Sequence, residues 1–154
     1  MLASISVAAS KPSTPIEFTL SDQDGIKRVV DYPREKISVL VVADQKGSSE
    51  IAGWIAPLYA RYEKQVDITG IAALPGIPPM FHGLFRREFK KRLTYPVMLD
   101  WKGDVSRSFG YEKERAQLFV ISRDGRVVLS ESGAANEQGL ARVFSEIDRL
   151  RRGR

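Results

Sequence analysis

The chain has 154 residues, of which 43% are hydrophobic and 28% charged, and it contains no cysteine. This size suits one ordinary domain with a single core, and the lack of cysteine excludes disulfides, thiolate metal sites and any thiol nucleophile. The 24 basic and 19 acidic residues give a net charge of +5. No segment of the sequence reaches the roughly 18 apolar residues that a membrane helix needs.

The N-terminal residues are mildly apolar and rich in small side chains, like the end of a secretory signal, but they lack its basic start. We therefore expect a flexible tail over 1–15, one domain over 16–150 and a basic tail over 151–154. A cytoplasmic protein is expected. An exported or periplasmic protein is the alternative if Met1 is a trimmed start.

The first half of the domain predicts a hairpin and then two strands with a helix between them. Residues 16–32 predict the hairpin, because extended, partly alternating segments flank turn residues at 21–25. Continuous apolar runs at 39–42 and 68–74 predict central strands covered on both faces. The helix is expected over 48–64, with four apolar residues on one face and a proline that should kink it: Ile51, Ile55, Leu58, Tyr62 and Pro57.

The second half begins with a rigid proline loop at 75–79, which leads into a helix with one apolar and one basic face. A short strand at 96–99 and a helical turn at 105–109 come next. The remaining elements are a hairpin around 123–125 and a last helix over 136–150. Together the elements predict a mixed sheet covered on both sides.

This order of elements resembles the thioredoxin fold in its longer version, as in peroxiredoxins of the AhpC/TSA type and redoxin-type thiol-disulfide reductases. Four parts of the sequence carry the resemblance: 18–20 with 24–25, 55–58, 96–100 with 109–110, and 118–121 with 124–125. The resemblance implies an α/β fold, a thioredoxin-like three-layer sandwich. Its mixed central sheet would have helices on both faces and an N-terminal β-hairpin.

The resemblance also implies where the catalytic groups are missing. Counting back from Pro57, the two cysteines of a thioredoxin would fall at Ser49 and Ala52. In a peroxiredoxin, Ser49 would match a hydroxyl residue and Ala52 the reactive cysteine. A hydroxyl cannot replace a polarisable, easily deprotonated sulfur, so thiol peroxidase and disulfide reductase activity should be absent. The cis-proline of the family would fall at Ala116, where a trans bond is expected.

A catalytic site without sulfur is an open alternative, centred on Ser49, Arg115 and His82. Arg115 lies one position from the arginine that peroxiredoxins use, although a solvated loop arginine explains it equally. Ser48 or Ser49 could also act as a nucleophile with His82 and Asp100, but no elbow motif holds the serine. Helix capping accounts for both serines. A single histidine without cysteine is a poor metal site, so neither metal nor cofactor is expected.

The helix after the proline loop offers a second kind of site, for an anion. Its basic face could bind an anionic partner, although a solvated surface is the plain alternative. The aromatic residues Phe85 and Phe89 are expected on the opposite, buried face. They would therefore not stack on bases, and nucleic acid is not an expected partner. The candidate anion-binding residues are Arg86, Arg87, Lys90 and Lys91.

Two tryptophans complete the candidates, because Trp54 lies off the apolar line of its helix and Trp101 follows a strand end. If both were exposed near 75–80, they would form an apolar patch for a partner. The sequence therefore predicts a redox-inactive module that binds a protein or small ligand. The candidate residues for this binding are Ser48, Ser49, Trp54, Trp101 and Arg115. The ligand, the partner and the oligomeric state are not specified by the sequence.

Overall fold

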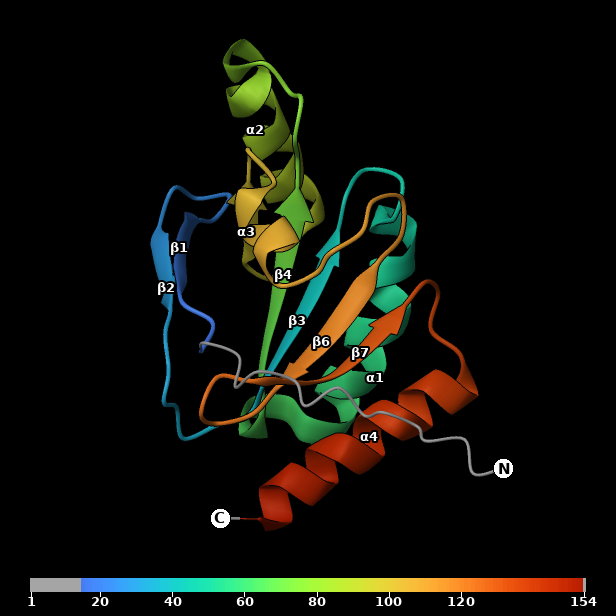
Figure 1. The fold of residues 1–154 in the computed structure, drawn as a ribbon. Coiled ribbons are helices and arrows are strands. Elements are labelled where there is room, and N and C mark those ends of the chain that lie inside the picture. Colours follow the sequence, from blue (N-terminus) through green and yellow to red (C-terminus); the bar gives the residue numbers. More distant parts are fainter. Residues whose placement is uncertain (1–14, 154) are drawn as a thin grey trace, which may run out of the picture.

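A computed structural model describes residues 15–153, and it contains a five-stranded mixed sheet and a two-stranded sheet (Figure 1). The tail expected over 1–15 lies outside the described residues, apart from Pro15. The large sheet has the order β5-β4-β3-β6-β7. Its strands are β3 (Ser38–Ala43), β4 (Asp67–Ala73), β5 (Val97–Asp100), β6 (Gln117–Ile121) and β7 (Val127–Ser132).

The centre of the sheet is β3, whose six residues are all buried. It runs parallel to β4 and antiparallel to β6, so Val41 lies beside Gly70 on one side and beside Leu118 on the other. A strand with neighbours on both edges and cover on both faces needs a continuous apolar sequence. The prediction that 39–42, 68–71 and 118–121 share one sheet is confirmed.

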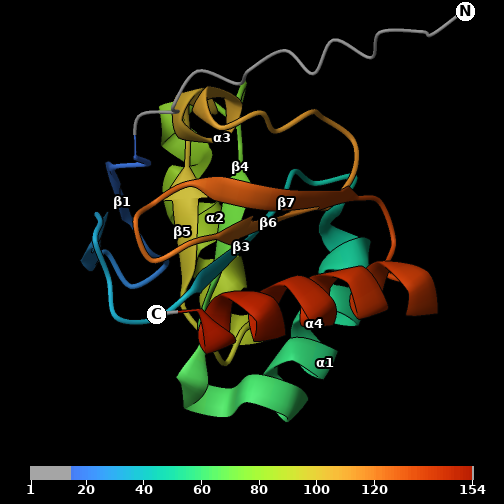
Figure 2. The same ribbon diagram turned by 60° about the horizontal axis from the view of Figure 1, so that its bottom comes forward.

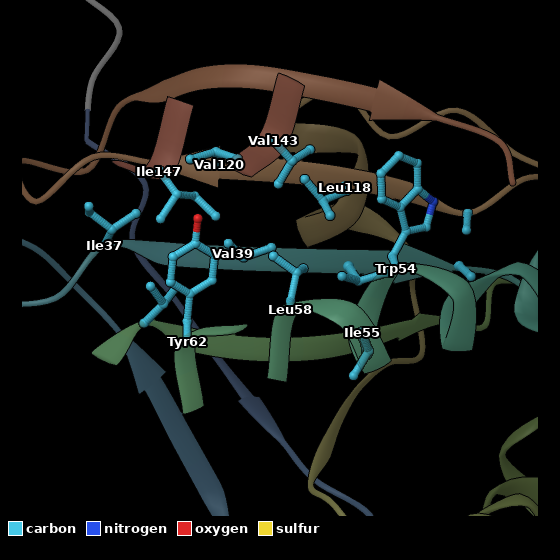
Figure 3. Packing of buried hydrophobic residues seen from close by; sticks show 14 residues of the cluster. Ile37, Val39, Trp54, Ile55, Leu58, Tyr62, Leu118, Val120, Val143 and Ile147 are labelled. Carbon is cyan, nitrogen blue, oxygen red and sulfur yellow. The ribbon is translucent and has the colours of Figure 1, made fainter. Parts of the chain in front are cut away.

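One face of the sheet is covered by α1 (Ile51–Tyr62) and α4 (Glu137–Arg152). Leu58 of α1 and Val143 of α4 are fully buried there against Val39 and Val41 of β3 (Figure 3). Two short 3-10 segments extend α1, namely η1 (Ser48–Glu50) before it and η2 (Glu63–Gln65) after it. The helix expected over 48–64 is therefore present, but its first and last turns are 3-10.

The same face continues over β4 and β5, where α2 (His82–Arg92) lies after the short η3 (Pro79–Phe81). Ala43 of β3 pairs in register with Ala72 of β4, and neighbours in register point to the same face. Ala72, Leu74 and Leu99 pack with Phe89 of α2. Thus α2 is a neighbour of α1 on one face, and Figure 1 shows its first turn standing out beyond the sheet.

The opposite face carries the hairpin of β1 (Phe18–Ser21) and β2 (Lys27–Val30), together with the chain around α3 (Asp104–Ser108). Phe18 and Phe109 pack there against Phe119 of the sheet. The sheet therefore has cover on both faces, as the sequence predicted. In the described range 15–153, no helix is both long and apolar enough to cross a membrane.

The last helix is longer than the sequence predicted. It begins after Asn136, whose side chain accepts a hydrogen bond from Gly139 N, and it continues to Arg152. Arg151 and Arg152 are therefore helical instead of belonging to the basic tail expected over 151–154. Arg151 also lies over the ring of Tyr62, 5.6 Å from its centroid, which gives its charge a packing role.

Candidate functional site

The site that the sequence singled out lies where β3 ends and α1 begins, at the carboxyl edge of the parallel strands. Ser48, Ser49 and Ala52 are all exposed at this start. Neither serine caps the helix as expected. The residue before η1 is Gly47 and the residue before α1 is Glu50, and neither makes a side-chain capping bond. The Ser48 hydroxyl donates instead to Gln45 O at 2.8 Å.

The turn before η1 packs against the loop that carries Arg115 and Ala116. A side chain at Gly47 would place its Cβ only 2.6 Å from Ala116 N, so glycine is required by this close approach. Ala116 is completely buried. In the part of the chain that the structure describes, only Tyr32–Pro33 is cis, and the bond before Ala116 is trans.

Two carboxylates hold this loop to the start of α1. Asp44 accepts from Gly47 N at 2.9 Å through one oxygen and from Glu114 N at 2.7 Å through the other. The second bond fixes Glu114 in the left-handed region, with φ of 76°. Glu50 accepts from Ala116 N at 3.0 Å. Both acids therefore serve as acceptors for backbone amides.

Tyr111 also joins the 114–116 loop to the end of β3. Its hydroxyl accepts from Asp44 N and donates to Arg115 O, both at 2.9 Å. Burial is the main cause that raises the pKa of Tyr111 to about 12. The phenol consequently keeps its proton at neutral pH and remains a hydrogen-bond donor to the loop.

Most backbone N–H and C=O groups of the 114–116 loop thus already form hydrogen bonds within the chain. Arg115 O, Ala116 N and Glu114 N are bonded as described above, and Ala116 O accepts from Gly133 N at 2.8 Å. An extended segment that paired with this loop would have to break these bonds. The free surface beside Ser48 and Ala52 lies instead on the other side of α1, toward α2.

A groove of about 590 Å³ occupies that side, between the start of α1 and the length of α2. Its volume and its mainly apolar lining are typical of small-ligand sites. The floor comes from the ends of β3 and β4, and the polar groups lie at the edges. Lining residues that matter below are Ser48, Ala52, Gly70, Ala72, Leu84 and Phe89, with Glu88 and Arg92 on the α2 wall.

Neither tryptophan forms the exposed patch that the sequence suggested. Trp54 is only 1% exposed, and its indole Nε1 donates to Gly133 O at 2.8 Å. It is therefore a core residue, and the exposure on which its candidate binding role depended is not found. Trp101 is half-buried and stacks on His82, with ring centroids 3.7 Å apart. This stack holds the first residue of α2 against the turn after β5.

The structure does not assemble the serine triad that we considered. His82 has Nε2 3.1 Å from Ile77 O, and Asp100 accepts from Gly103 N and from both N and Oγ of Ser106. Among residues 15–153, no hydrogen bond links His82 to Asp100, to either serine or to Arg115. Nor do three or more His, Asp or Glu side chains of this range gather as a metal site.

The basic face of α2 is largely free. In the described range no acidic side chain lies within 4 Å of Arg86 or Arg87, whereas Lys90 pairs with Asp24 at 3.7 Å and Lys91 with Glu88 at 4.0 Å. The opposite face is less covered than expected. Phe85 and Phe89 are half-buried and Leu84 is 52% exposed, so no residue of α2 is fully buried.

The fold is that of thioredoxin-like proteins. The chain matches no protein-family model, and the comparison with curated proteins gave no match. Three similar solved structures come from bacteria. The exposed lipoprotein thioredoxin Etrx1 of Streptococcus pneumoniae is 17% identical, with 84% of this chain and 98% of that chain covered and a TM-score of 0.66.

The other two structures have similar scores. A putative thiol:disulfide interchange protein DsbE of Chlorobium tepidum is 19% identical, with coverage of 87% and 93% and a TM-score of 0.66. A putative protein disulfide isomerase of Bacteroides thetaiotaomicron is 20% identical, with coverage of 88% and 86% and a TM-score of 0.62. At these identities the likeness defines the fold. The chain thus has the fold of thiol-disulfide oxidoreductases without a single cysteine.

Sequence reasoning missed the residues that hold the site together, namely Asp44 and Tyr111. Glu50 was noticed only as a favourable charge near a helix start. Asp44 had one usable signal, because an aspartate directly after a buried strand often caps the next turn. Tyr111 had none, since its partners Asp44 and Arg115 are brought to it by the fold.

Proposed function

We propose that this chain is a redox-inactive thioredoxin-like module that binds a protein segment or a small ligand in the groove between α1 and α2. The observation that carries the proposal is the groove itself, about 590 Å³ and mainly apolar, directly beside Ser48 and Ala52. The DsbE and disulfide isomerase structures named above are, by their names, proteins of thiol and disulfide chemistry. That chemistry needs a thiolate, and this chain has no cysteine to supply one.

The closed state of the 114–116 loop supports the groove as the binding surface. The backbone amides of Glu114 and Ala116 are bonded to Asp44 and Glu50, which leaves them unavailable to a partner. A divergent redoxin- or peroxiredoxin-like enzyme built on Ser49, Arg115 and His82 has no comparable support. Its histidine is stacked on Trp101 and placed beside Ile77 O.

The cellular compartment of the protein is a separate prediction. The cytoplasm is the expectation from the sequence, and export is the alternative. The similar pneumococcal protein is an exposed lipoprotein, which supports the exported alternative.

The groove is tested by filling it. Ala52 is exposed and lines the groove in the first turn of α1, so Ala52→Phe places a ring in the opening without disturbing the core. Ala60→Phe makes the same change at an exposed position of α1 outside the groove. The probe is the uncharged apolar dye N-phenyl-1-naphthylamine, whose fluorescence rises in apolar sites and which carries no charge for the basic residues of α2 to attract.

We expect the wild type and Ala60→Phe to bind the dye alike, and Ala52→Phe to bind it about tenfold or more weakly, because the ring occupies the apolar volume. Amide shifts of the wild type on dye addition should centre on Ser48, Ala52 and Gly70. Equal binding by all three proteins, or shifts centred elsewhere, would overturn the groove as the site.

A second candidate function has its own observation. Arg86 and Arg87 are exposed and have no acidic neighbour within 4 Å among residues 15–153, which favours binding of an anionic partner by α2. Retention on heparin, lost on neutralising both arginines, tests this candidate.

A further inference from the structure

The first turn of α2 and the residues just before it form an apolar tip. Met80 is 82% exposed, Phe81 46% and Leu84 52%, and these are three of the large apolar side chains that the described chain leaves exposed. Residues three and four apart lie on one side of a helix, so Leu84 adjoins Met80 and Phe81. Figure 1 shows this end of α2 as the part that projects farthest beyond the sheet. We call Met80, Phe81 and Leu84 the apolar tip.

A belt of positive charge follows the tip along the helix. Residues 82–92 contain five basic side chains and one acidic side chain, Glu88. Arg86 and Arg87 have no acidic neighbour in the described range, and Lys91 reaches Glu88 only at 4.0 Å. Lys90 has a longer-range pair with Asp24. Most of this charge is therefore available to an external anion.

The order of the two features matters as much as their presence. From Phe81 to Arg87 the helix rises about 9 Å, at 1.5 Å per residue. Interfacial protein segments place their apolar side chains about 5–10 Å deep at the boundary of headgroups and acyl chains. If the tip entered to that depth, Arg86 and Arg87 would lie level with lipid phosphates, and Lys91 would begin about 6 Å farther along the helix, within reach of them through its long side chain.

We propose that α2 docks the protein on an anionic phospholipid surface, with Met80, Phe81 and Leu84 inserted and Arg86, Arg87 and Lys91 paired with phosphates. This inference rests on the second candidate function, anion binding by α2, and of its residues only Leu84 also lines the groove. The apolar tip distinguishes a lipid surface from other polyanions, since a purely electrostatic site has no use for exposed methionine and phenylalanine.

An acidic protein surface is a less suitable occupant. The tip projects beyond the sheet and its three side chains are apolar, whereas the concave surface with polar groups at its edges is the groove, which only Leu84 of the three tip residues also lines (Figure 1). Fluid acyl chains accommodate a projecting Met80 and Phe81 without a preformed pocket. Binding to an acidic protein is therefore an outcome that the experiment must separate.

The experiment measures sedimentation of the full chain with two kinds of vesicle. One contains phosphatidylcholine alone, and the other contains about one part in three of phosphatidylglycerol, enough to give a negative surface potential. Three double variants are compared: Arg86→Gln with Arg87→Gln, Met80→Ser with Phe81→Ser, and the control Lys64→Gln with Arg152→Gln. The control removes two charges from η2 and the end of α4, at the opposite end of the molecule from the tip.

We expect the wild type to bind the anionic vesicles and not the neutral ones, and to lose binding as salt is raised. The arginine variant should bind about tenfold or more weakly, because each cation near the surface contributes about fivefold and two are removed. The Met80 and Phe81 variant should also lose about tenfold through lost insertion, whereas the control should match the wild type. Melting curves of all four proteins verify that each is folded.

Three results would overturn the inference: no binding of the wild type to anionic vesicles, unchanged binding by the Met80 and Phe81 variant, or an equal loss in the control. Heparin retention, measured in parallel, separates this failure from failure of anion binding. If the arginines govern heparin retention while vesicles do not bind, the lipid inference fails and anion binding stands. If the arginines affect neither, both fail.

Discussion

Two helices on the same face of the sheet, α1 and α2, each have one apolar side, but α2 is far richer in charged residues and the two helices differ in burial. Four residues of α1 are buried, Trp54, Ile55, Leu58 and Tyr62, whereas none of α2 is. Part of the difference is a neighbouring helix. In Figure 2, α4 lies beside α1 in the same layer, and their side chains close one core with the sheet, whereas α2 shares no such core with a second helix in the described range. The apolar face of a helix predicts which side is turned toward the core, but the neighbouring elements determine how far that side is buried.

The largest expected effect is in the core under α1. Trp54→Ala removes a buried indole and its bond to Gly133 O, so the free energy of unfolding should fall by about 3–5 kcal/mol. Leu84→Ala, on half-exposed α2, should cost less than about 1 kcal/mol. Urea denaturation of both variants measures the difference. Similar losses would mean that α2 is as firmly packed as α1.

Glycines at the two helices provide the next contrast. Gly47→Ala forces a Cβ against the Arg115–Ala116 backbone, and a destabilisation of about 2 kcal/mol or more is expected because backbone on both sides must move. Gly83 of α2 has nothing within 4 Å of an added Cβ, so Gly83→Ala should stabilise by about 0.5–1 kcal/mol through helix propensity. Thermal melting gives both signs. A neutral Gly47→Ala would contradict the close packing described above.

Sequence patterns were sufficient for the sheet and for the identity of each helix. Apolar runs such as 39–42 allow only a buried strand, and the periodicity of Leu58 and Tyr62 allows only one inward face of α1. Helix ends were less accurate, because caps depend on contacts. Arg151 stays helical by packing on Tyr62, 5.6 Å from its ring centroid, which no local pattern encodes.

The start of α1 was predicted in place, but the contacts that hold it were not. Counting from Pro57 located the start of α1, whereas Asp44, Glu50 and Tyr111 act through partners up to 70 residues away in the sequence. The environment of Trp54 was left open for a related reason. Its place off the main apolar line of the helix allowed either the core edge or an exposed patch, and the chain after β7 decides for the core, because Gly133 O accepts its N–H bond.

Cysteines placed at the start of α1 test how much of the thioredoxin geometry survives there. The wild type should neither reduce insulin disulfides nor consume peroxide, since it has no thiol. Ser49→Cys with Ala52→Cys should form a disulfide on oxidation and stabilise by about 1–2 kcal/mol, because side chains three apart at a helix start come within bonding distance. Ser49→Cys alone is the control. Free thiols that persist after oxidation would indicate a remodelled turn.

Smaller effects are expected from the polar contact that joins α1 to α4. Tyr62 donates to Asp148 Oδ1 at 2.8 Å, and Arg61 donates to the other oxygen at 2.9 Å. Burial is the main cause that raises the pKa of Tyr62 to about 12. Burial alone would raise the pKa of Asp148 as well, but the bonds from Arg61 and Tyr62 outweigh it and hold that pKa below its usual range.

The pKa shifts of Asp148 and Tyr62 make the stability of the folded chain depend on pH at opposite ends of the range. The pKa of Asp148 is lower in the folded chain, so its contribution is complete above about pH 4 and is lost as the pH falls through the folded pKa. The pKa of Tyr62 is higher in the folded chain, so its contribution is complete below about pH 10 and is lost as the pH rises through the folded pKa. Tyr62→Phe should cost about 1 kcal/mol at neutral pH.

Asp148→Asn separates the loss of stability at low pH that Asp148 causes from the loss that the other carboxyl groups cause. This variant should lose less stability than the wild type between about pH 7 and pH 3, because the shifted carboxyl is gone. Urea denaturation across that range makes the comparison. Parallel pH curves for the two proteins would show that the contact between α1 and α4 does not depend on this charge.

The smallest expected effect is at the basic face of α2. Replacing Arg86, Arg87, Lys90 and Lys91 with glutamine removes two exposed pairs, Lys90 with Asp24 at 3.7 Å and Lys91 with Glu88 at 4.0 Å, which together contribute no more than about 1 kcal/mol. The same change relieves two like-charge pairs four residues apart, each costing about 0.2–0.5 kcal/mol. These terms nearly cancel, so the free energy of unfolding should change by less than about 0.5 kcal/mol.

Urea denaturation with an unchanged dependence on denaturant would confirm that the charged face of α2 is not part of the fold. A loss above about 1.5 kcal/mol would show the reverse, that these side chains hold α2 in place as α4 holds α1. The outcome matters because binding losses in the arginine variants can be assigned to the surface only if the helix survives their removal. With α2 held through Phe89 and the stack of His82 on Trp101, neither of which the four substitutions touch, we expect it to survive.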